Sequence, residues 1–264
     1  MLFKGSKSSI YIKGNVESSN PLFFFHGFTG SSGSWESIRN LIQSKSYAID
    51  LPGHGKSRFK YLNEIYTIND FCSEFYLLLN SLNINKVNLC GYSLGGRLAL
   101  SFAYSYPEKI NSLILESTSY GIENIDERES RLENDLALSE SIKSNYEKFV
   151  FKWNNLDFFK NQKKRNIKDW ELQNSIRLDH NNEHLAKSLE SFSQGKMNYL
   201  GKEIHTLNFP VYLISGEEDD KYFKIAYKSM QINKNVKHIK VVKSGHNTHL
   251  ENPDFFVEVI DQLL

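Results

Sequence analysis

The stretch Gly91-Tyr92-Ser93-Leu94-Gly95-Gly96 decides the fold, because a short apolar run, Val87 to Cys90, leads into it and a helical pattern follows it. This order predicts a strand, a sharp turn and a helix, and the small residues two before and two after Ser93 permit a strained backbone there. The free N–H groups at the start of the helix would point at the serine hydroxyl. A lone G-x-S-x-G occurs often by chance, so the rest of the chain has to decide its function.

Length and composition fit one large domain or a domain with an insertion. The chain has 264 residues, 40% of them hydrophobic, and a formal net charge of +1, which argues against a broad basic surface for nucleic acid. No apolar run approaches the roughly 18 residues of a membrane span, and Met1 to Gly14 lacks the apolar core of a signal peptide. We therefore expect a cytoplasmic monomer or homodimer that acts on a small molecule, away from nucleic acid and membrane.

Strands and helices are predicted to alternate along most of the chain. Apolar runs predict buried strands at 22–25, 47–49, 87–90, 112–115, 211–215 and 238–242. Helical patterns lie between them, for example from Thr67 to Leu82 and from Ser34, a candidate N-cap, to Gln43. With an edge hairpin at 2–13, this alternation predicts a mostly parallel, doubly wound sheet that binds ligands beyond the carboxyl ends of its strands.

The alternation stops between about Tyr120 and Gly201, where charged, helix-favouring residues dominate. We expect a core from residues 1–119 and 202–264 and an inserted helical cap from residues 120–201. The basic run Lys163-Lys164-Arg165 within the cap is interpreted as solvated surface, as most charge clusters are.

A catalytic serine needs a histidine to take its proton and an acid to orient that histidine. Asp219 lies in the loop after the strand at 211–215 and His246 follows the next strand, which gives the chain order Ser, Asp, His. The candidate catalytic residues are therefore Ser93, Asp219 and His246. Asp220 competes with Asp219 for the acid, and His249 competes with His246 for the base.

Two backbone N–H groups are candidates for an oxyanion hole. Phe28 lies in the Gly-rich turn after the strand at 22–25, and Leu94 follows the serine directly. Both turns follow central strands, so the sequence predicts that the Phe28 and Leu94 N–H groups meet beside Ser93.

Two other kinds of site are rejected. The segment ending in G-H-G-K-S has Asp50 where a phosphate loop requires glycine. The pairs His246/His249 and His180/His184 lack the thiolates or the H-E-x-x-H arrangement of a zinc site. We expect neither a metal nor a cofactor.

Several motifs together resemble the α/β-hydrolase superfamily over nearly the whole chain. These are the elbow, His26-Gly27-Phe28, D-L-P-G-H-G-K-S at 50–57 and G-H-x-x-H-x-E-x-P at 245–253. A finer match is similar to the 2-succinyl-6-hydroxy-2,4-cyclohexadiene-1-carboxylate synthase family of menaquinone biosynthesis. The segments that carry it are 26–31, 91–97, 127–131 with Asp135, 149–153, and the Gly-Glu-x-Asp of the acid loop.

This resemblance implies a carbon-oxygen lyase of the α/β-hydrolase fold. Such an enzyme eliminates pyruvate from a cyclohexene that carries an enolpyruvyl ether, a ring carboxylate and a succinyl side chain. The triad would abstract a proton and the oxyanion hole would stabilise an enolate, so no acyl-enzyme is required. The same groups could also perform ester hydrolysis, because a triad and an oxyanion hole stabilise oxyanions of either kind.

The resemblance also implies which residues bind the tricarboxylate substrate. Arginine forks match carboxylates better than lysine does, and Arg97 lies one helical turn past Ser93 on a face that can look back at it. The residues carried over as substrate-binding are Arg97, Arg131, Arg177, Tyr92, Trp153 and His26. Arg128 is the alternative to Arg131 and is otherwise a surface residue paired with nearby glutamates.

Two other functions fit the same sequence. A carboxylesterase or carbon–carbon bond hydrolase would share the fold and triad, but an apolar ester would leave buried arginines unpaired. A non-catalytic ligand receptor would keep the pocket, although intact Ser, Asp and His residues argue against it.

Overall fold

The core of the protein is an eight-stranded sheet in the order β1-β2-β4-β3-β5-β6-β7-β8. The computed structural model describes residues 1–14, 20–232 and 235–264. The strands are β1 (Leu2–Lys4), β2 (Ser9–Lys13), β3 (Leu22–Phe25), β4 (Ser46–Asp50), β5 (Val87–Tyr92), β6 (Ile110–Glu116), β7 (Val211–Gly216) and β8 (Val236–Val241). Among the strand pairs of the described residues, only β1–β2 and β2–β4 are antiparallel, so the predicted edge hairpin and mostly parallel sheet are confirmed.

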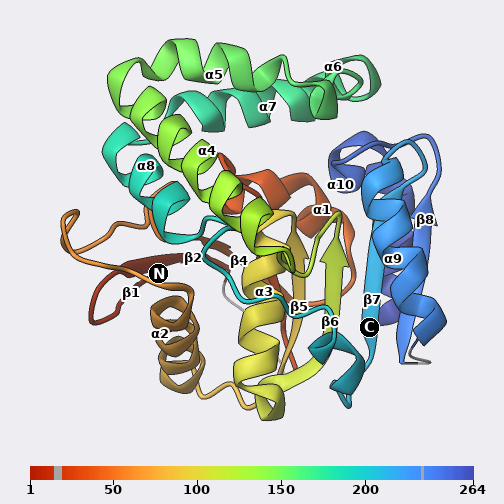
Figure 1. Ribbon diagram of the computed structural model, residues 1–264. Coiled ribbons are helices and arrows are strands. Elements are labelled where there is room, and N and C mark those ends of the chain that lie inside the picture. Colours follow the sequence, from red (N-terminus) through yellow and green to blue (C-terminus); the bar gives the residue numbers. More distant parts are fainter. Residues whose placement is uncertain (15–19, 233–234) are drawn as a thin grey trace.

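Helices cover both faces of the sheet (Figure 1). The sheet helices are α1 (Glu36–Leu41), α2 (Ile68–Ser81), α3 (Leu94–Ser105), α9 (Asp220–Ile232), α10 (Thr248–Glu251) and α11 (Pro253–Leu263). Phe23 and Phe25 belong to the apolar cluster with α2 and α3, whereas Leu22 and Phe24 belong to the cluster with α1 and α11. Because successive strand residues face opposite sides, β3 has to be apolar throughout, and all four of its residues are buried.

The sequence predicts the N-cap of one helix correctly and that of another incorrectly. Thr67 caps α2 as predicted, in a capping box with Asp70. The helical segment after β3 begins instead as a 3-10 turn, Ser32–Trp35, whose N-cap is Ser31. Ser34 is the reciprocal partner in that capping box, because its hydroxyl accepts the N–H of Ser31 at 3.2 Å. The prediction of Ser34 as the N-cap was therefore wrong by one turn.

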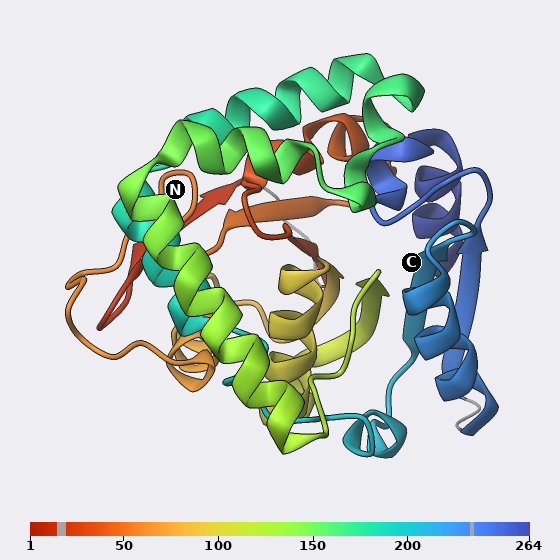
Figure 2. The same ribbon diagram turned by 45° about the horizontal axis from the view of Figure 1, so that its top comes forward.

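Five α-helices come from the stretch between β6 and β7, where the sequence predicts a cap. They are α4 (Ile125–Ser144), α5 (Tyr146–Asn154), α6 (Gln162–Arg165), α7 (Ile167–Leu178) and α8 (Asn182–Ser191). Figures 1 and 2 show them as an arc over the end of the sheet at which β5 and β6 finish. Their small apolar cluster, which includes Phe149 and Leu185, also contacts Phe28 of the core. Of the helices in the described ranges, none is long and apolar enough to cross a membrane.

The chain reverses its winding between β3 and β5. The strand β4 lies on one side of β3 and β5 on the other, and Phe25 of β3 is paired with Gly91 of β5. Ligands of doubly wound sheets bind at such a switch point, beyond the carboxyl ends of the strands. The turns that contain Phe28 and Ser93 both leave the sheet there.

Gly95 permits the close approach of α3 to β3. A Cβ at this position would lie 2.3 Å from the carbonyl oxygen of Phe25 and 2.5 Å from that of His26. Both neighbours are backbone atoms of a central strand and its exit, so neither has room to yield. Gly95 therefore sets the distance between the elbow and the Phe28 turn.

We predict that Gly95→Ala lowers the free energy of unfolding by about 2 kcal/mol or more, because α3 has to move away from β3. Urea denaturation followed by circular dichroism measures this. The control is Ser105→Ala at the exposed end of the same helix, which we expect to stay within about 0.5 kcal/mol of wild type. Equal unfolding free energies for the two variants would contradict the packing argument.

Candidate active site

Ser93 occupies a strained turn between β5 and α3. Its φ is 50° and its ψ is −107°, a left-handed conformation that non-glycine residues rarely adopt. The Ser93 N–H donates to the carbonyl of Glu116 on β6 at 2.9 Å, which anchors the turn to the neighbouring strand. Leu94 begins α3, so its N–H lies at the positive end of the helix dipole.

The structure brings Ser93, His246 and Asp219 together. His246 Nε2 lies 3.3 Å from Ser93 Oγ, and His246 Nδ1 lies 2.7 Å from Asp219 Oδ2. With the Nδ1 proton donated to the carboxylate, Nε2 is the atom free to accept the serine proton. His246 and Asp219 are buried, and the His246 ring packs on Tyr222 and Phe158 with centroid distances of 4.8 and 5.2 Å.

Asp220 and His249, the alternatives to Asp219 and His246, lie elsewhere in the structure. Asp220 is exposed at the start of α9. His249 is buried, stacks on Trp35 at a centroid distance of 4.0 Å, and pairs through Nδ1 with Glu116 Oε2 at 2.7 Å. Neither residue lies between the serine and its partners, so the geometry favours Asp219 and His246.

The two expected oxyanion donors are free. Within the described part of the chain, neither the Phe28 N–H nor the Leu94 N–H has a hydrogen-bond acceptor. Phe28 is held by ring contacts with Trp153 and His54, at centroid distances of 5.4 and 5.7 Å. Both N–H groups are thus available to an oxygen that develops charge beside Ser93.

Three buried histidine rings support the turn that contains Phe28. His26 bonds to Gly27 O through Nδ1 and accepts the Leu51 N–H at Nε2. His180, which follows α7, contacts Thr29 O through Nε2 at 3.0 Å. The His54 ring lies between them, 4.8 Å from His26 and 5.4 Å from His180 between ring centroids. His26 was expected to bind substrate; its ring lines the pocket, but backbone groups occupy both nitrogens.

Burial keeps these histidines neutral. It lowers the pKa of His26 to about 4 and lowers the pKa of His180. Burial and the neighbouring His26 and His180 rings lower the pKa of His54 well below its usual range. A neutral ring both donates and accepts, which the backbone bonds of His26 require.

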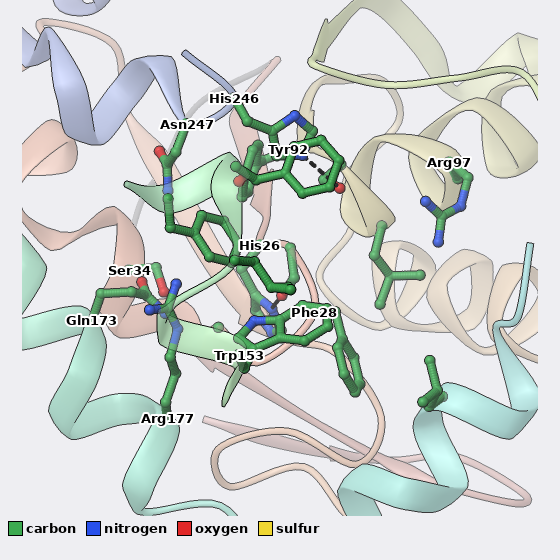
Figure 3. A pocket seen from close by; sticks show the side chains of 18 of the residues that line it. His26, Phe28, Ser34, Tyr92, Arg97, Trp153, Gln173, Arg177, His246 and Asn247 are labelled. Atoms are coloured by element: carbon green, nitrogen blue, oxygen red, sulfur yellow. Dashed lines mark hydrogen bonds between the residues drawn. The ribbon is translucent and has the colours of Figure 1, made fainter. Parts of the chain in front are cut away.

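A cavity of about 250 Å³ opens beside Ser93. Besides Ser93 and His246, the polar and charged residues that line it include Arg97, Arg131, Asp135, Gln173, Arg177, Lys221, Asn247 and His249. Arg97 and Arg177 lie on opposite sides of this pocket, with Tyr92 and His246 between them (Figure 3). An elongated ligand with an anionic group at each end would therefore fit between Arg97 and Arg177, in the pocket that Ser93 also lines.

One side of the pocket is formed by Arg97 and Arg131. Arg97 is only 8% exposed, its Nε has no partner among the described residues, and no carboxylate there is paired with it. Burial, followed by the charge of Arg131, lowers the pKa of Arg97 to about 10. Arg131 is half-buried and donates through Nε to both oxygens of Asp135, each at 2.9 Å. Arg97 therefore carries a charge that the protein does not neutralise.

The other side is formed by Arg177, from α7. It donates to Asn154 Oδ1 at 2.5 Å and lies 4.8 Å above the Phe159 ring, but among the described residues it too lacks an ion-pair partner. Burial lowers the pKa of Arg177 to about 10. The Trp153 indole N–H is buried without an acceptor in the described structure, which leaves a second donor in this pocket.

Several lining residues were not found by sequence reasoning. Gln173 and Asp135 lie at i−4 and i+4 from Arg177 and Arg131, so helical spacing could have indicated that they share a face. Asn247 and Lys221 are next to or near the triad residues, but no pattern marked them. Arg128, the alternative to Arg131, donates to Gly195 O at 3.4 Å and does not line the pocket.

Several known proteins are similar to this chain in sequence or in fold. The family model for the alpha/beta hydrolase fold matches residues 20–253. A Bacillus subtilis (strain 168) protein provisionally named 2-succinyl-6-hydroxy-2,4-cyclohexadiene-1-carboxylate synthase is 34% identical over 242 residues, covering 90% of this chain and 88% of the relative. A Salmonella arizonae protein with that synthase name is 30% identical over 249 residues, covering 92% and 93%.

A solved structure, "Structure of MenH from S. aureus", superimposes with a TM-score of 0.87 and is 29% identical, covering 97% of this chain and 96% of that one. A thermophilic esterase from Thermogutta terrifontis superimposes almost as well, with a TM-score of 0.85, but is 17% identical. At that identity the second likeness shows the fold alone.

We predict that Asp219→Asn slows phosphonylation of Ser93 by a fluorophosphonate about a thousandfold, because His246 loses the carboxylate that orients it. The matched control is Asp220→Asn, which we expect to react at nearly the wild-type rate since Asp220 is exposed on α9. Mass spectrometry of the intact protein over time measures both rates. The reverse ranking would assign the acid to Asp220.

We also predict that the free energy of unfolding falls as the pH drops from about 6.5, the unfolded pKa of histidine, towards 4. His26, His54 and His180 have lowered pKa values in the folded protein, so unfolding takes up protons in this window and stability is complete above it. Urea denaturation at several pH values measures the slope. His180→Gln should make this slope less steep, because up to about one proton fewer is taken up on unfolding. A wild-type free energy of unfolding that stays constant from pH 7 to 5 would contradict the assignment.

Proposed function

The chain belongs to the α/β hydrolase fold family and, within it, to the 2-succinyl-6-hydroxy-2,4-cyclohexadiene-1-carboxylate synthases, and from this membership we propose that it is a carbon-oxygen lyase of menaquinone biosynthesis. The proposed substrate is 2-succinyl-5-enolpyruvyl-6-hydroxy-3-cyclohexene-1-carboxylate, a tricarboxylate, and the proposed products are pyruvate and the cyclohexadiene. The observation that supports this best is the pair of buried arginines, Arg97 and Arg177, that lack an acidic partner in the described structure.

The electrostatics favour an anionic substrate. Burying a guanidinium without a counter-charge costs free energy, and an incoming carboxylate removes that cost. Arg97 and Arg177 lie on opposite sides of the pocket, so a substrate with separated carboxylates would be held at two points (Figure 3). Arg131, already paired with Asp135, offers its remaining guanidinium donors beside Arg97. An apolar ester would leave both charges buried and unpaired.

In the proposed mechanism Ser93 acts as a base. Its hydroxyl proton moves to His246 Nε2 as Ser93 Oγ takes the proton from the carbon next to the succinyl carbonyl. The electrons of the broken C–H bond form an enolate, whose oxygen accepts the Phe28 and Leu94 N–H groups. Collapse of the enolate forms a double bond from the deprotonated ring carbon, shifts the existing ring double bond by one position towards the ether carbon, and breaks the carbon–oxygen bond to the enolpyruvyl group. The released enolpyruvate takes up a proton at carbon and becomes pyruvate.

Asp219 would stabilise the imidazolium that forms on His246 during this step, since its carboxylate lies 2.7 Å from Nδ1. Tyr92 flanks the reacting centre, with its ring 5.4 Å from that of His246 between centroids. The free indole N–H of Trp153 would donate to a substrate oxygen near Arg177. No cofactor or metal is needed for any of these transfers.

We predict that the purified protein releases pyruvate from this substrate in an assay coupled to lactate dehydrogenase. Ser93→Ala should lower kcat about a thousandfold or more, because the base is removed. Arg97→Ala should lower kcat/KM about a hundredfold through the lost charged contact, and Arg128→Ala is its matched control, since Arg128 lies outside the pocket.

A different outcome would change the assignment. If the wild type releases no pyruvate but hydrolyses a small activated ester through Ser93, the lyase proposal fails and the protein is a carboxylesterase of the same fold. If Ser93 reacts with neither the ester nor a fluorophosphonate, the pocket belongs to a ligand receptor.

A further inference from the structure

Arg165 does not behave as the solvated surface residue that its basic run predicted. Lys163 and Lys164 are exposed, but the Arg165 side chain is 19% exposed and forms ion pairs with both Glu218 and Glu251. Arg165 ends α6, and of its two partners Glu218 lies in the loop after β7, whereas Glu251 is the last residue of α10, the helix that follows the loop of His246. One guanidinium fork thus connects the helices over the sheet with two separate core segments.

Those two segments carry the acid and the base of the candidate triad. Glu218 immediately precedes Asp219, and its own N–H donates to Ser244 O at 2.9 Å. Glu251 Oε2 accepts the N–H of Gly245, the residue before His246, at 3.0 Å. Arg165 therefore contacts the residue next to Asp219, and through Glu251 it is connected by one hydrogen bond to the residue next to His246.

Glu251 is the stronger of the two attachments. Its side chain is 1% exposed, whereas that of Glu218 is 44% exposed and its ion pair is open to screening by solvent. Burial raises the pKa of the Glu251 carboxyl, and Arg165 is its one cationic partner among the described residues. Without Arg165 a buried carboxylate would be left uncompensated beside the His246 loop, which is unfavourable unless the carboxyl moves or takes up a proton.

We propose that Arg165 is a positioning residue that holds the loops of Asp219 and His246 in the register that places His246 Nε2 on Ser93. The two arms of the guanidinium fix the two loops relative to each other, and Glu251 transmits this to the Gly245–His246 peptide. The inference rests on the proposed function only for its reaction readout, because the alignment of Ser93, His246 and Asp219 is the same for a lyase and an esterase.

This role differs from that of an ordinary stabilising ion pair. A purely structural pair would change the unfolding temperature and leave the rate of the folded enzyme unaltered, whereas displaced catalytic groups lower the rate of each turnover. Arg165 is also absent from the lining of the pocket. Its loss should therefore lower kcat and leave KM nearly unchanged.

The test compares Arg165→Gln and Arg165→Lys with Lys164→Gln, an exposed neighbour in the same basic run. For each variant, the rate of Ser93 phosphonylation by a fluorophosphonate, kcat and KM for pyruvate release, and thermal unfolding are measured. We expect Arg165→Gln to lower phosphonylation and kcat about 10- to 100-fold with KM within about twofold. Arg165→Lys should recover part of the loss, since a point charge pairs with Glu251 but does not span both loops. Lys164→Gln should match wild type.

A second, independent test uses the variant Glu251→Gln. The glutamine oxygen still accepts the Gly245 N–H but carries no buried charge, so Arg165→Gln should cost less in this background than in wild type. If the two substitutions combine additively, or if Arg165→Gln reacts at the wild-type rate, the proposal is overturned. A rise in KM alone would also overturn it, because it would assign Arg165 to substrate binding.

Two further results would distinguish a failure of folding, or of the proposed lyase function, from a failure of the Arg165 proposal. If Arg165→Gln does not fold, Glu218→Gln removes only the exposed arm, and the proposal then requires a smaller but measurable loss in phosphonylation. If the wild type releases no pyruvate, the lyase assignment fails while the phosphonylation series still tests Arg165.

Discussion

The backbone crowding around Ser93 is the constraint on which the rest of the site depends. The N-terminus of α3 lies so close to β3 and the turn after it that a side chain at Gly95 would collide with the backbone carbonyl oxygens of Phe25 and His26. This contact holds Ser93 at a positive φ and leaves the Leu94 N–H without an intrahelical acceptor. It also brings α3 against the turn that supplies Phe28. Ser93 and both candidate oxyanion donors are thus fixed by packing of backbone on backbone, which no side-chain rotation can relax.

The charged groups of the pocket are, by contrast, only partly compensated within the protein, and burying a charge without a partner is energetically unfavourable. Arg97 and Arg177 are buried, and this burial lowers the pKa of each guanidinium to about 10. By contrast, Arg131 and Arg165 lie beside carboxylates that neutralise them. Charged groups left uncompensated in a folded protein reduce its stability and are kept where a ligand supplies the missing partner. The distribution therefore separates arginines that are buried without a counter-charge, which a bound anion would supply, from arginines that already have one within the protein, a distinction that residue type alone does not make.

The parts that could be predicted from sequence are those in which one local pattern has one physical cause. The four apolar residues of β3 indicate a strand buried on both faces, and the glycines around Ser93 indicate a tight turn. The ion pairs of Arg165 could not be predicted, because its partners lie 53 and 86 residues away and a basic run usually faces water. Ser31 was missed as a cap because Ser31, Ser32 and Ser34 are equally good candidates, and only the backbone conformation chooses between them. That Arg97 and Arg177 would face each other across Ser93 is likewise a tertiary fact.

The triad alone does not determine the reaction. A serine, a histidine and two N–H donors stabilise a tetrahedral oxyanion and an enolate oxyanion equally well, since both place negative charge on an oxygen in the same position. The difference lies in what is presented to Ser93 Oγ. An acyl carbon within reach would be attacked, whereas an acidic C–H bond within reach would be deprotonated. In the proposed reaction the choice is made by the two cationic sides of the pocket, because a substrate anchored at both ends cannot slide its carbonyl carbon onto the serine. Reaction specificity would then reside in Arg97 and Arg177, on two helices that flank Ser93, and not in the groups that perform the chemistry.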